Sequence, residues 1–506
     1  MVTASRHAAV TREQGWALGL ASAASFMVVL DLLAVATALS TIHRDLGASI
    51  GQLEWTVNAY TLAFAVLLMT AAAVGDRFGR RRVFAAGLGV FAAGSAACAL
   101  APGVGALIAA RAVQGVGAAM VMPLALALLN AAFPPQRRGW AMGIFGGVTG
   151  LAVVVGPVLG GAITQGIAWQ WIFWLNVPIA LVGISLALRR LPESYGPRAA
   201  LDLPGLGLAA GAALGLVWGL VRGSSAGWAS PEVAGSLAAG GVLAVAFTAW
   251  EMRARAPMLP MRLFAFRGFS AGNAAIFLLN ASLTGVVFFT AQFLQVSLGQ
   301  DPLGAGLRLL PWGVAPFLIG PQAGKLADRI GERPLVVSGL LLQAAGLAWI
   351  AVIAAPGLAY AVMLAPMFVS GAGFALALPA LTKAVVGSVP LGDIGKASGA
   401  FSTMRQLGGA FGVAILAAVF GVAGSYSSAA SFSAGFAPAA AAAAGLALAG
   451  ALAALALPGR HVEAEPAPAR RGAGAAPGEG QPVRRRSAAT VIPASSARDM
   501  HNDRYA

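Results

Sequence analysis

Long apolar stretches alternate with short polar segments along most of the chain. A helix that crosses a lipid bilayer needs about 20 mostly apolar residues. Fourteen stretches meet this requirement, and we predict a membrane-spanning helix from each. Their approximate cores are Ala17–Leu39, Trp55–Val74, Val83–Leu100, Gly105–Leu129, Trp140–Gly161, Trp171–Leu188, Leu203–Val221, Val233–Trp250, Phe269–Leu294, Leu307–Leu326, Leu335–Ala355, Leu358–Leu381, Ala400–Val422 and Phe436–Leu457.

One short charged loop occurs twice. Residues 72–82 read Ala-Ala-Val-Gly-Asp-Arg-Phe-Gly-Arg-Arg-Arg, between the second and third predicted helices. Residues 324–333 read Gly-Lys-Leu-Ala-Asp-Arg-Ile-Gly-Glu-Arg, and their aspartate lies 252 residues after the first one. Six spans with short loops occupy only roughly 190–200 residues, which leaves room for about two more spans. The repeat therefore predicts two similar halves separated by an inserted pair of helices.

The expected fold is an all-α polytopic membrane protein with fourteen transmembrane helices. Residues 1–190 form an N-terminal six-helix half, and residues 263–457 form a C-terminal six-helix half. Residues 191–262 are a linker that carries the two inserted helices. Residues 458–506 mix proline, alanine, glycine and arginine, with too little apolar content to pack, and we expect a disordered cytoplasmic tail.

Lysine and arginine predict the orientation of the helices. Cytoplasmic loops are enriched in these residues. If both termini are cytoplasmic, the predicted outer loops hold only Arg44, Arg222 and Arg308. The remaining loops are rich in positive charge, and the asymmetry alternates through every loop. We therefore expect a multi-pass protein of the cell membrane with both termini inside.

Composition agrees with a membrane protein. The chain is 58% hydrophobic and 10% charged, with a mean hydropathy of +0.79, whereas soluble domains carry about 25% charged residues. The net charge of +15 follows from positive cytoplasmic loops, and no basic face is interleaved with aromatic residues, so we expect no nucleic-acid partner. The first apolar run is too long for a cleavable signal sequence.

Enzyme and cofactor chemistry is not indicated. Cys98 is the single cysteine, which excludes an intramolecular disulfide and a metal site of the cysteine type. No phosphate-binding loop or zinc-protease motif occurs. Residues 268–272 read Gly-Phe-Ser-Ala-Gly, but the hydrolase motif needs a strand-turn-helix context, and here it opens a membrane helix. We expect no cofactor, no metal, no catalytic residues and no obligate protein partner.

Asp31 is the one carboxylate clearly inside a predicted span. A charged residue in the bilayer is costly, and it indicates a functional site with a partner to be named. Asp31 lies roughly 13 Å from the outer end of its helix and Arg111 roughly 10 Å from the outer end of the fourth, at 1.5 Å per residue. The two can share one layer. Burial raises the proton affinity of an aspartate and a nearby arginine lowers it, so the pair can exchange a proton. A static ion pair is the alternative.

Four motifs together resemble the major facilitator superfamily, and within it the fourteen-span drug/proton antiporters of the EmrB/QacA type. They are the repeated loop, residues 107–119 with Arg111 on the fourth helix, residues 156–161 (Gly-Pro-Val-Leu-Gly-Gly) on the fifth, and residues 169–178 with Asn176 on the sixth. The resemblance covers about residues 15–455. It implies that Arg111 takes part in proton coupling, and that the fifth-helix motif marks antiport.

The resemblance also implies residues that control the conformation. In the loops these are Asp76, Arg77, Gly79, Arg81, Asp328 and Arg329, and in the fifth helix Gly156, Pro157, Gly160 and Gly161. From the residues themselves, Asp76 could cap the third helix and pair with a neighbouring arginine. The glycines and proline could allow one helix to bend and slide on a neighbour. A membrane anchor and tight static packing are the respective alternatives.

Polar residues within spans usually face the bundle interior or a water-filled cavity, although hydrogen bonding between helices explains each one equally well. The candidates for a substrate cavity are Asn58, Tyr60, Gln114, Asn280, Gln292, Gln295 and Arg405. We therefore predict a secondary transporter that exports amphipathic drugs or antibiotic-like metabolites in exchange for protons. Its partners would be the small-molecule substrate, protons and the lipid bilayer. Proton-coupled symport of a small metabolite and a non-transporting membrane sensor on the same fold are the alternatives.

Overall fold

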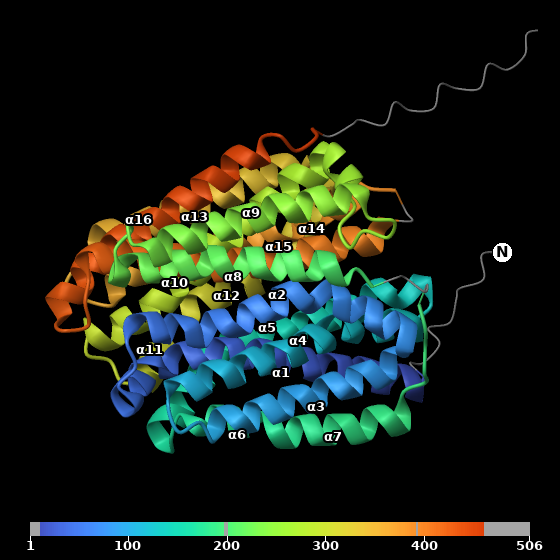
Figure 1. Ribbon diagram of the computed structural model, residues 1–506, viewed down its shortest axis with the longest axis horizontal. Helices are drawn as coiled ribbons and strands as arrows, with labels where there is room; N and C mark the ends of the chain where they lie inside the picture. Colours follow the sequence, from blue (N-terminus) through green and yellow to red (C-terminus); the bar gives the residue numbers. More distant parts are fainter. Residues whose placement is uncertain (1–10, 197–200, 391–392, 460–506) are drawn as a thin grey trace, which may run out of the picture. The chain divides into compact units, whose positions relative to one another are not determined.

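The computed structural model describes residues 11–196, 201–390 and 393–459 (Figure 1). Within these ranges the regular structure is entirely helical. The N-terminal half contains α1 (Arg12–Leu46), α2 (Ile50–Phe78), α3 (Arg80–Ala99), α4 (Val104–Ala132), α5 (Pro135–Gly166), α6 (Gln170–Trp174) and α7 (Asn176–Arg190). The inserted helices are α8 (Leu203–Ala226) and α9 (Pro231–Arg253). The remainder contains η1 (Met261–Ala265), α10 (Arg267–Val296), α11 (Pro302–Arg308), α12 (Leu310–Ile330), α13 (Glu332–Ile353), α14 (Ala361–Gly387), α15 (Ile394–Ala423) and α16 (Ala429–Ala454).

The prediction of fourteen spans is confirmed, because the described residues contain 14 helical segments long and apolar enough to cross a membrane. Two spans are interrupted, at Leu175 between α6 and α7 and at Leu309 between α11 and α12. Pro178 and Pro311 lie in the first turns that follow, where a missing backbone N–H is tolerated. The predicted tail from residue 460 lies outside the described residues, and the proposed boundaries at residues 190, 262 and 457 stay predictions.

Local sequence explains where the first two helices begin. Thr11 and Ser49 each accept a hydrogen bond from the backbone N–H of a glutamine three residues later, and that glutamine side chain accepts from the N–H of the cap residue. These capping boxes use the N–H groups that the first turn of a helix leaves unpaired. Gly47, with φ of +62°, ends α1 in the left-handed conformation that glycine adopts most easily.

The two halves repeat one packing pattern. In the first half α1 packs on α5, α3 packs on α4, and α2 packs on α4. In the second half the corresponding contacts join α10 to α15, α13 to α14, and α12 to α14. The contacts between halves, α2 with α15 and α5 with α11 and α12, are also related by the repeat. The structure therefore supports the twofold organisation that the repeated loop predicted.

Glycines hold the repeated helix pairs together at equivalent positions. Gly87 and Gly94 bring α3 against α4, where an added Cβ would overlap Met120 and the backbone of Gln114. Gly339 and Gly346, each 252 residues further on, bring α13 against α14 in the same way. Small residues let membrane helices approach closely. The inserted helices α8 and α9 pack on each other, and α8 also contacts α2 and α15, so it bridges the halves on that side.

Candidate functional site

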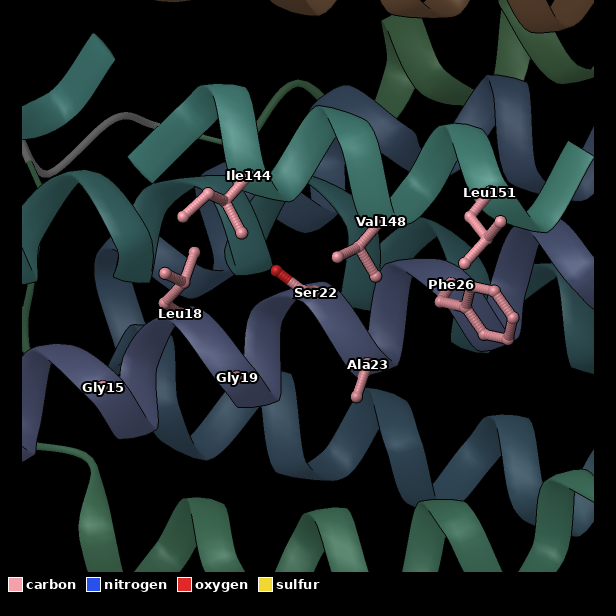
Figure 2. Close-up of a pocket in the computed structure, with 9 residues that line it drawn as sticks. All are labelled: Gly15, Leu18, Gly19, Ser22, Ala23, Phe26, Ile144, Val148 and Leu151. Atoms are coloured by element: carbon pink, nitrogen blue, oxygen red, sulfur yellow. The ribbon is translucent and has the colours of Figure 1, made fainter. Parts of the chain in front are cut away.

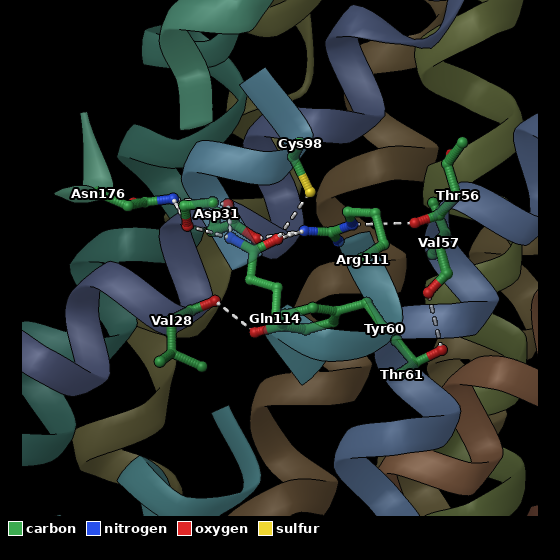
Figure 3. Close-up of polar contacts among 11 residues, drawn as sticks. Val28, Asp31, Thr56, Val57, Tyr60, Thr61, Cys98, Arg111, Gln114 and Asn176 are labelled. Carbon is green, nitrogen blue, oxygen red and sulfur yellow. Dashed lines mark hydrogen bonds and ion pairs between the residues drawn. The ribbon is translucent and has the colours of Figure 1, made fainter. Parts of the chain in front are cut away.

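A buried polar network occupies the N-terminal half (Figure 3). Arg111 on α4 donates through Nη1 to Oδ2 of Asp31 on α1, at 2.5 Å, and neither side chain has exposed surface. The structure thus brings together the two residues that the sequence analysis placed in one layer. Their role in proton coupling stays a prediction.

Two amides complete the coordination of the aspartate. Gln114 and Asn176 donate to Asp31 Oδ1 at 2.9 and 2.8 Å, and both amides also donate to the Ser95 hydroxyl. Gln114 in turn accepts from Arg111 Nη1 at 2.6 Å. The carboxylate therefore receives three donors, one of them charged, which together compensate the cost of burying its charge.

Arg111 is held in place by further contacts. Its Nε donates to the Thr56 carbonyl at 3.0 Å, and its guanidinium carbon lies 4.2 Å from the centre of the Tyr60 ring and 5.7 Å from that of Phe173. Nη2 has no partner among the described residues. A guanidinium is attracted electrostatically to the face of an aromatic ring, and this contact stabilises the position of Arg111. Several helices therefore hold the guanidinium in place, and among the described residues both N–H donors of Nη2 are unused.

Sequence reasoning missed part of this network. Ser95 and the Thr56 carbonyl carried no pattern that singled them out. Asn176 was visible only as a member of the sixth-helix motif. Tyr60 and Gln114, predicted to line a substrate cavity, lie in the network with no exposed surface, and their role in a cavity stays a prediction. Tyr60 also donates to the Val28 carbonyl at 3.3 Å, which joins α2 to α1.

The first charged loop is tied to the segment that follows α7. Arg80 Nε donates to Asp76 Oδ1 at 2.8 Å, and Arg80 N donates to the Ser194 carbonyl at 2.9 Å. Glu193 accepts from the backbone N–H of Arg81 at 2.9 Å. Gly79, with φ of +107°, makes the reversal between α2 and α3. The expectation that Asp76 caps α3 is wrong, because Asp76 lies in the last turn of α2 and Glu193, from a remote segment, bonds the first turn of α3.

The other predicted loop residues lie near this contact or in the second loop. Arg81 also donates to the Leu191 carbonyl at 3.1 Å, while Arg77 is exposed over the Phe78 ring. In the second loop Gly331, with φ of +90°, repeats the reversal, and Arg329 is exposed. The side chain of Asp328 lies outside the described part of the structure.

The fifth-helix motif touches both halves. Gly156 and Gly160 face α1, where an added Cβ would overlap Leu33 and the backbone of Ala34. Gly161 faces the other half, against the Pro302 carbonyl of α11, and Gly306 of α11 likewise faces the Pro157 carbonyl. Helix α5 continues through Pro157. The small residues therefore allow α5 to lie against α1 and α11 at the same level.

Known proteins match this arrangement. Residues 21–412 and 273–497 match the Major Facilitator Superfamily. The chain belongs to the major facilitator superfamily. It is 35% identical to a tetracenomycin C resistance and export protein of Streptomyces glaucescens, over 80% of this chain and 76% of that one. It is 36% identical to the puromycin resistance protein of Streptomyces alboniger, over 79% and 80% of the two chains.

A solved structure agrees on the fold. The crystal structure of a POT family transporter in complex with 5-aminolevulinic acid superposes with a TM-score of 0.66, over 87% of this chain and 95% of that one, at 14% identity. At this identity the likeness concerns the fold alone. The comparisons and the helices therefore establish that this chain is a multi-pass membrane protein of a transporter superfamily.

In this member of the superfamily a crevice separates α1 from α5 beyond the glycine contact (Figure 2). It has a volume of about 590 Å³ and is lined by residues 15–26 of α1 and residues 144–151 of α5. Its lining is apolar except for Ser22, whose hydroxyl has no hydrogen-bond partner within the described ranges. The two helices thus touch through Gly156 and Gly160 and diverge toward the end of the bundle that bears the charged loops.

The remaining cavity candidates fall into two groups. Gln292 and Gln295 lie near the opposite end of the bundle. Gln295 donates to the Thr37 carbonyl of α1 at 3.0 Å, and Gln292 accepts from the Tyr426 hydroxyl. Asn280 and Arg405 lie mid-helix, and Asn280 donates to the Arg405 carbonyl at 2.6 Å. These residues join α1 to α10 and α10 to α15, and their role in a cavity stays a prediction.

The structure corrects the statement that Asp31 is the one carboxylate within a span. Glu54 on α2 is 2% exposed and Glu251 on α9 is 3% exposed. The predicted core of the second span begins at Trp55, one residue after Glu54, and so Glu54 was not recognised as a carboxylate within a span. Asn58, predicted to line a cavity, lies one turn further along α2, is fully buried, and has no partner for either amide atom among the described residues.

Proposed function

We propose that this chain exports amphipathic, antibiotic-like molecules across the cell membrane in exchange for protons. The observation that carries the proposal is the buried Asp31–Arg111 pair on two helices of one half. Resistance to or export of antibiotics is what the names of the two relatives describe, and the Gly156–Gly161 motif resembles that of antiporters. Both termini would be cytoplasmic, as the distribution of positive charge indicates.

The network suggests how a proton would be used. Protonation of Asp31 removes the charge that Arg111 neutralises, and this weakens the 2.5 Å contact between α1 and α4. Arg111 would then turn toward other acceptors, while Gln114 and Asn176 keep the neutral acid oriented. Loss of the proton restores the pair. The two protonation states thus favour two arrangements of the same helices.

The helix contacts fit an alternating-access cycle. The described conformation holds α1, α5 and α11 together at the level of Gly160 and Gly161, and α1 and α5 diverge toward the charged loops. This corresponds to a molecule that is closed at the end predicted to face outside. If α5 slid along α1 and α11 on its small residues, the outer end would open and the end with the charged loops would close.

The test is proton movement in inverted membrane vesicles with a preformed pH gradient. Addition of puromycin or tetracenomycin C should discharge the gradient with the native protein and not with Asp31→Asn. A matched control is Glu13→Gln, an exposed carboxylate in the first turn of α1. Equal discharge by native protein and Asp31→Asn would overturn the assignment of Asp31. Substrate uptake that consumes the gradient in right-side-out vesicles would identify symport instead, and binding without flux would identify a sensor.

A further inference from the structure

Within the part of the chain that the structure describes, Glu54 is a buried carboxyl group without a counter-ion. Its side chain is 2% exposed, and among the described residues it forms no ion pair and Oε2 has no hydrogen-bond partner. Burying an ionised carboxylate without a partner costs far more than burying the neutral acid. In the described conformation the favourable state of Glu54 is therefore the protonated one.

The helix places Glu54 on the face of α2 that is turned toward the boundary between the halves. Tyr60, on one side of the helix, bonds α1 through the Val28 carbonyl. Leu62, on another side, packs with Ala410 of α15. Glu54 lies between these two faces on the helical wheel, at 100° per residue. Asn58 and Thr61 follow it at four and seven residues, so the three form one polar stripe along α2.

Tyr426 lies near Glu54, at the same end of the bundle. It lies in the connection between α15 and α16, donates to Gln292 of α10, and its ring centre is 5.4 Å from that of His43 at the end of α1. Burial raises the pKa of Tyr426, and an ionised Glu54 would raise it further, so its hydroxyl is a neutral donor in either state of Glu54. Glu54 thus lies near a contact that joins both halves, at the end predicted to face outside.

The charged groups on the neighbouring helices are engaged elsewhere. Arg111 of α4 bonds Asp31, and Arg222 of α8 bonds Glu232 at 3.0 Å. From α1 and the α15–α16 connection the titratable neighbours are His43 and Tyr426. His43 Nδ1 lies 2.6 Å from the Ala48 carbonyl, and among the described residues no ion pair joins Glu54 to a basic side chain as one joins Asp31 to Arg111.

We propose that Glu54 is a second proton-binding site, separate from Asp31, which takes its proton from the outer solution when the Tyr426 contact opens. The polar stripe provides a path for this proton toward the end of α2 that is predicted to be cytoplasmic. Asn58, with both amide atoms free of partners among the described residues, and Thr61 lie one and two turns further along the same face. Water that enters from the charged-loop end could contact them and accept the proton, leaving Glu54 ionised until the outer end opens again. No co-reactant other than water is needed.

The protonation of Glu54 can be tested without a substrate. Infrared spectra of the purified protein in lipid nanodiscs at neutral pH should contain the carbonyl stretch of a neutral carboxylic acid. We expect this component to be lost in Glu54→Gln and retained in Asp31→Asn, the matched buried carboxylate. Glu54→Asp, which keeps the acid, should shift the component without removing it. A spectrum that Glu54→Gln leaves unchanged would overturn the proposal.

A second measurement concerns coupling and rests on the proposed function. In proteoliposomes with the membrane potential clamped at zero, each coupled proton contributes a tenfold puromycin gradient for each unit of pH difference. Two proton sites give an accumulation of about 100-fold per pH unit, and Glu54→Gln should lower it to about 10-fold. An unchanged ratio would exclude Glu54 from coupling. If puromycin is not moved at all, the proposed function fails for this substrate, and the infrared result still decides the protonation of Glu54.

Discussion

Asp31 and Glu54 are both buried acids on neighbouring helices, and their surroundings are opposite. Asp31 has no exposed surface and receives three hydrogen bonds, one of them from a guanidinium. Glu54 is 2% exposed, and no hydrogen bond to it occurs within the described residues. Burial alone therefore does not determine the charge of an acid. The donors that other helices bring to it decide whether it is ionised or neutral.

The two acids also differ in how they relate to the movement of the halves. Every partner of Asp31 belongs to the N-terminal half, so the network can be preserved when that half moves as a body. Glu54 faces the boundary, near a contact that Tyr426 makes with both α1 and α10. A change in the relative position of the halves would alter the solvent access of Glu54 more directly than that of Asp31. Asp31 would therefore respond to protonation within one half, whereas the protonation of Glu54 would depend on the movement of the halves.

The largest expected effect comes from removing the charge partner of Asp31. Arg111→Met keeps much of the side-chain volume and leaves a buried carboxylate without its cation. Breaking a buried pair from one side costs about 3–5 kcal/mol. Thermal unfolding in detergent, followed by size-exclusion chromatography, should show a strongly destabilised protein.

The double variant Asp31→Asn with Arg111→Met is the control for this effect, because it leaves neither charge unpaired. It should recover a substantial part of the lost stability. If Arg111→Met alone were as stable as the native protein, Asp31 would not depend on Arg111, and its environment would resemble that of Glu54.

An intermediate effect should follow from Asn176→Ala. Asp31 Oδ1 would lose one of its two amide donors while the carboxylate stays buried. Leaving a buried acceptor short of one donor costs about 1–3 kcal/mol. The same unfolding assay measures it, with Ser185→Ala on the exposed side of α7 as the control. Equal stability of the two variants would mean that Asn176 does not support the ionised state of Asp31.

The sequence was sufficient for the membrane class, the number of spans, the twofold repeat and the pairing of Asp31 with Arg111. These features depend on the length of apolar runs, on the spacing of motifs, and on the cost of an isolated charge in an apolar helix. Each of them can be read directly from the sequence. The Asp31 network needed more. Ser95, Asn176 and the Thr56 carbonyl lie on three other helices, and their convergence depends on helix rotations that glycine contacts fix.

Two errors have a common physical origin in long-range contacts. Asp76 was expected to cap α3, but Glu193, more than a hundred residues away, reaches the first turn instead. Glu54 lies one residue before the predicted core of the second span, which begins at Trp55, and so it was not recognised as a carboxylate within a span. Residues near it, such as Tyr426, come from the far end of the chain. A local sequence pattern indicates the secondary structure that a residue favours. The burial of its side chain depends on segments that are distant in the sequence.

The smallest expected effect on stability is that of Glu54→Gln. If Glu54 is neutral in the described conformation, glutamine replaces it with a side chain of nearly the same shape and no charge difference. The stability should then change by less than about 1 kcal/mol, since no charged partner is left behind. Glu54→Lys is the contrasting variant, because it buries a cation in a place without a carboxylate, and it should be strongly destabilised. If Glu54→Gln instead destabilised the protein as much as Arg111→Met, Glu54 would be ionised and paired. The contrast with Asp31 would then disappear.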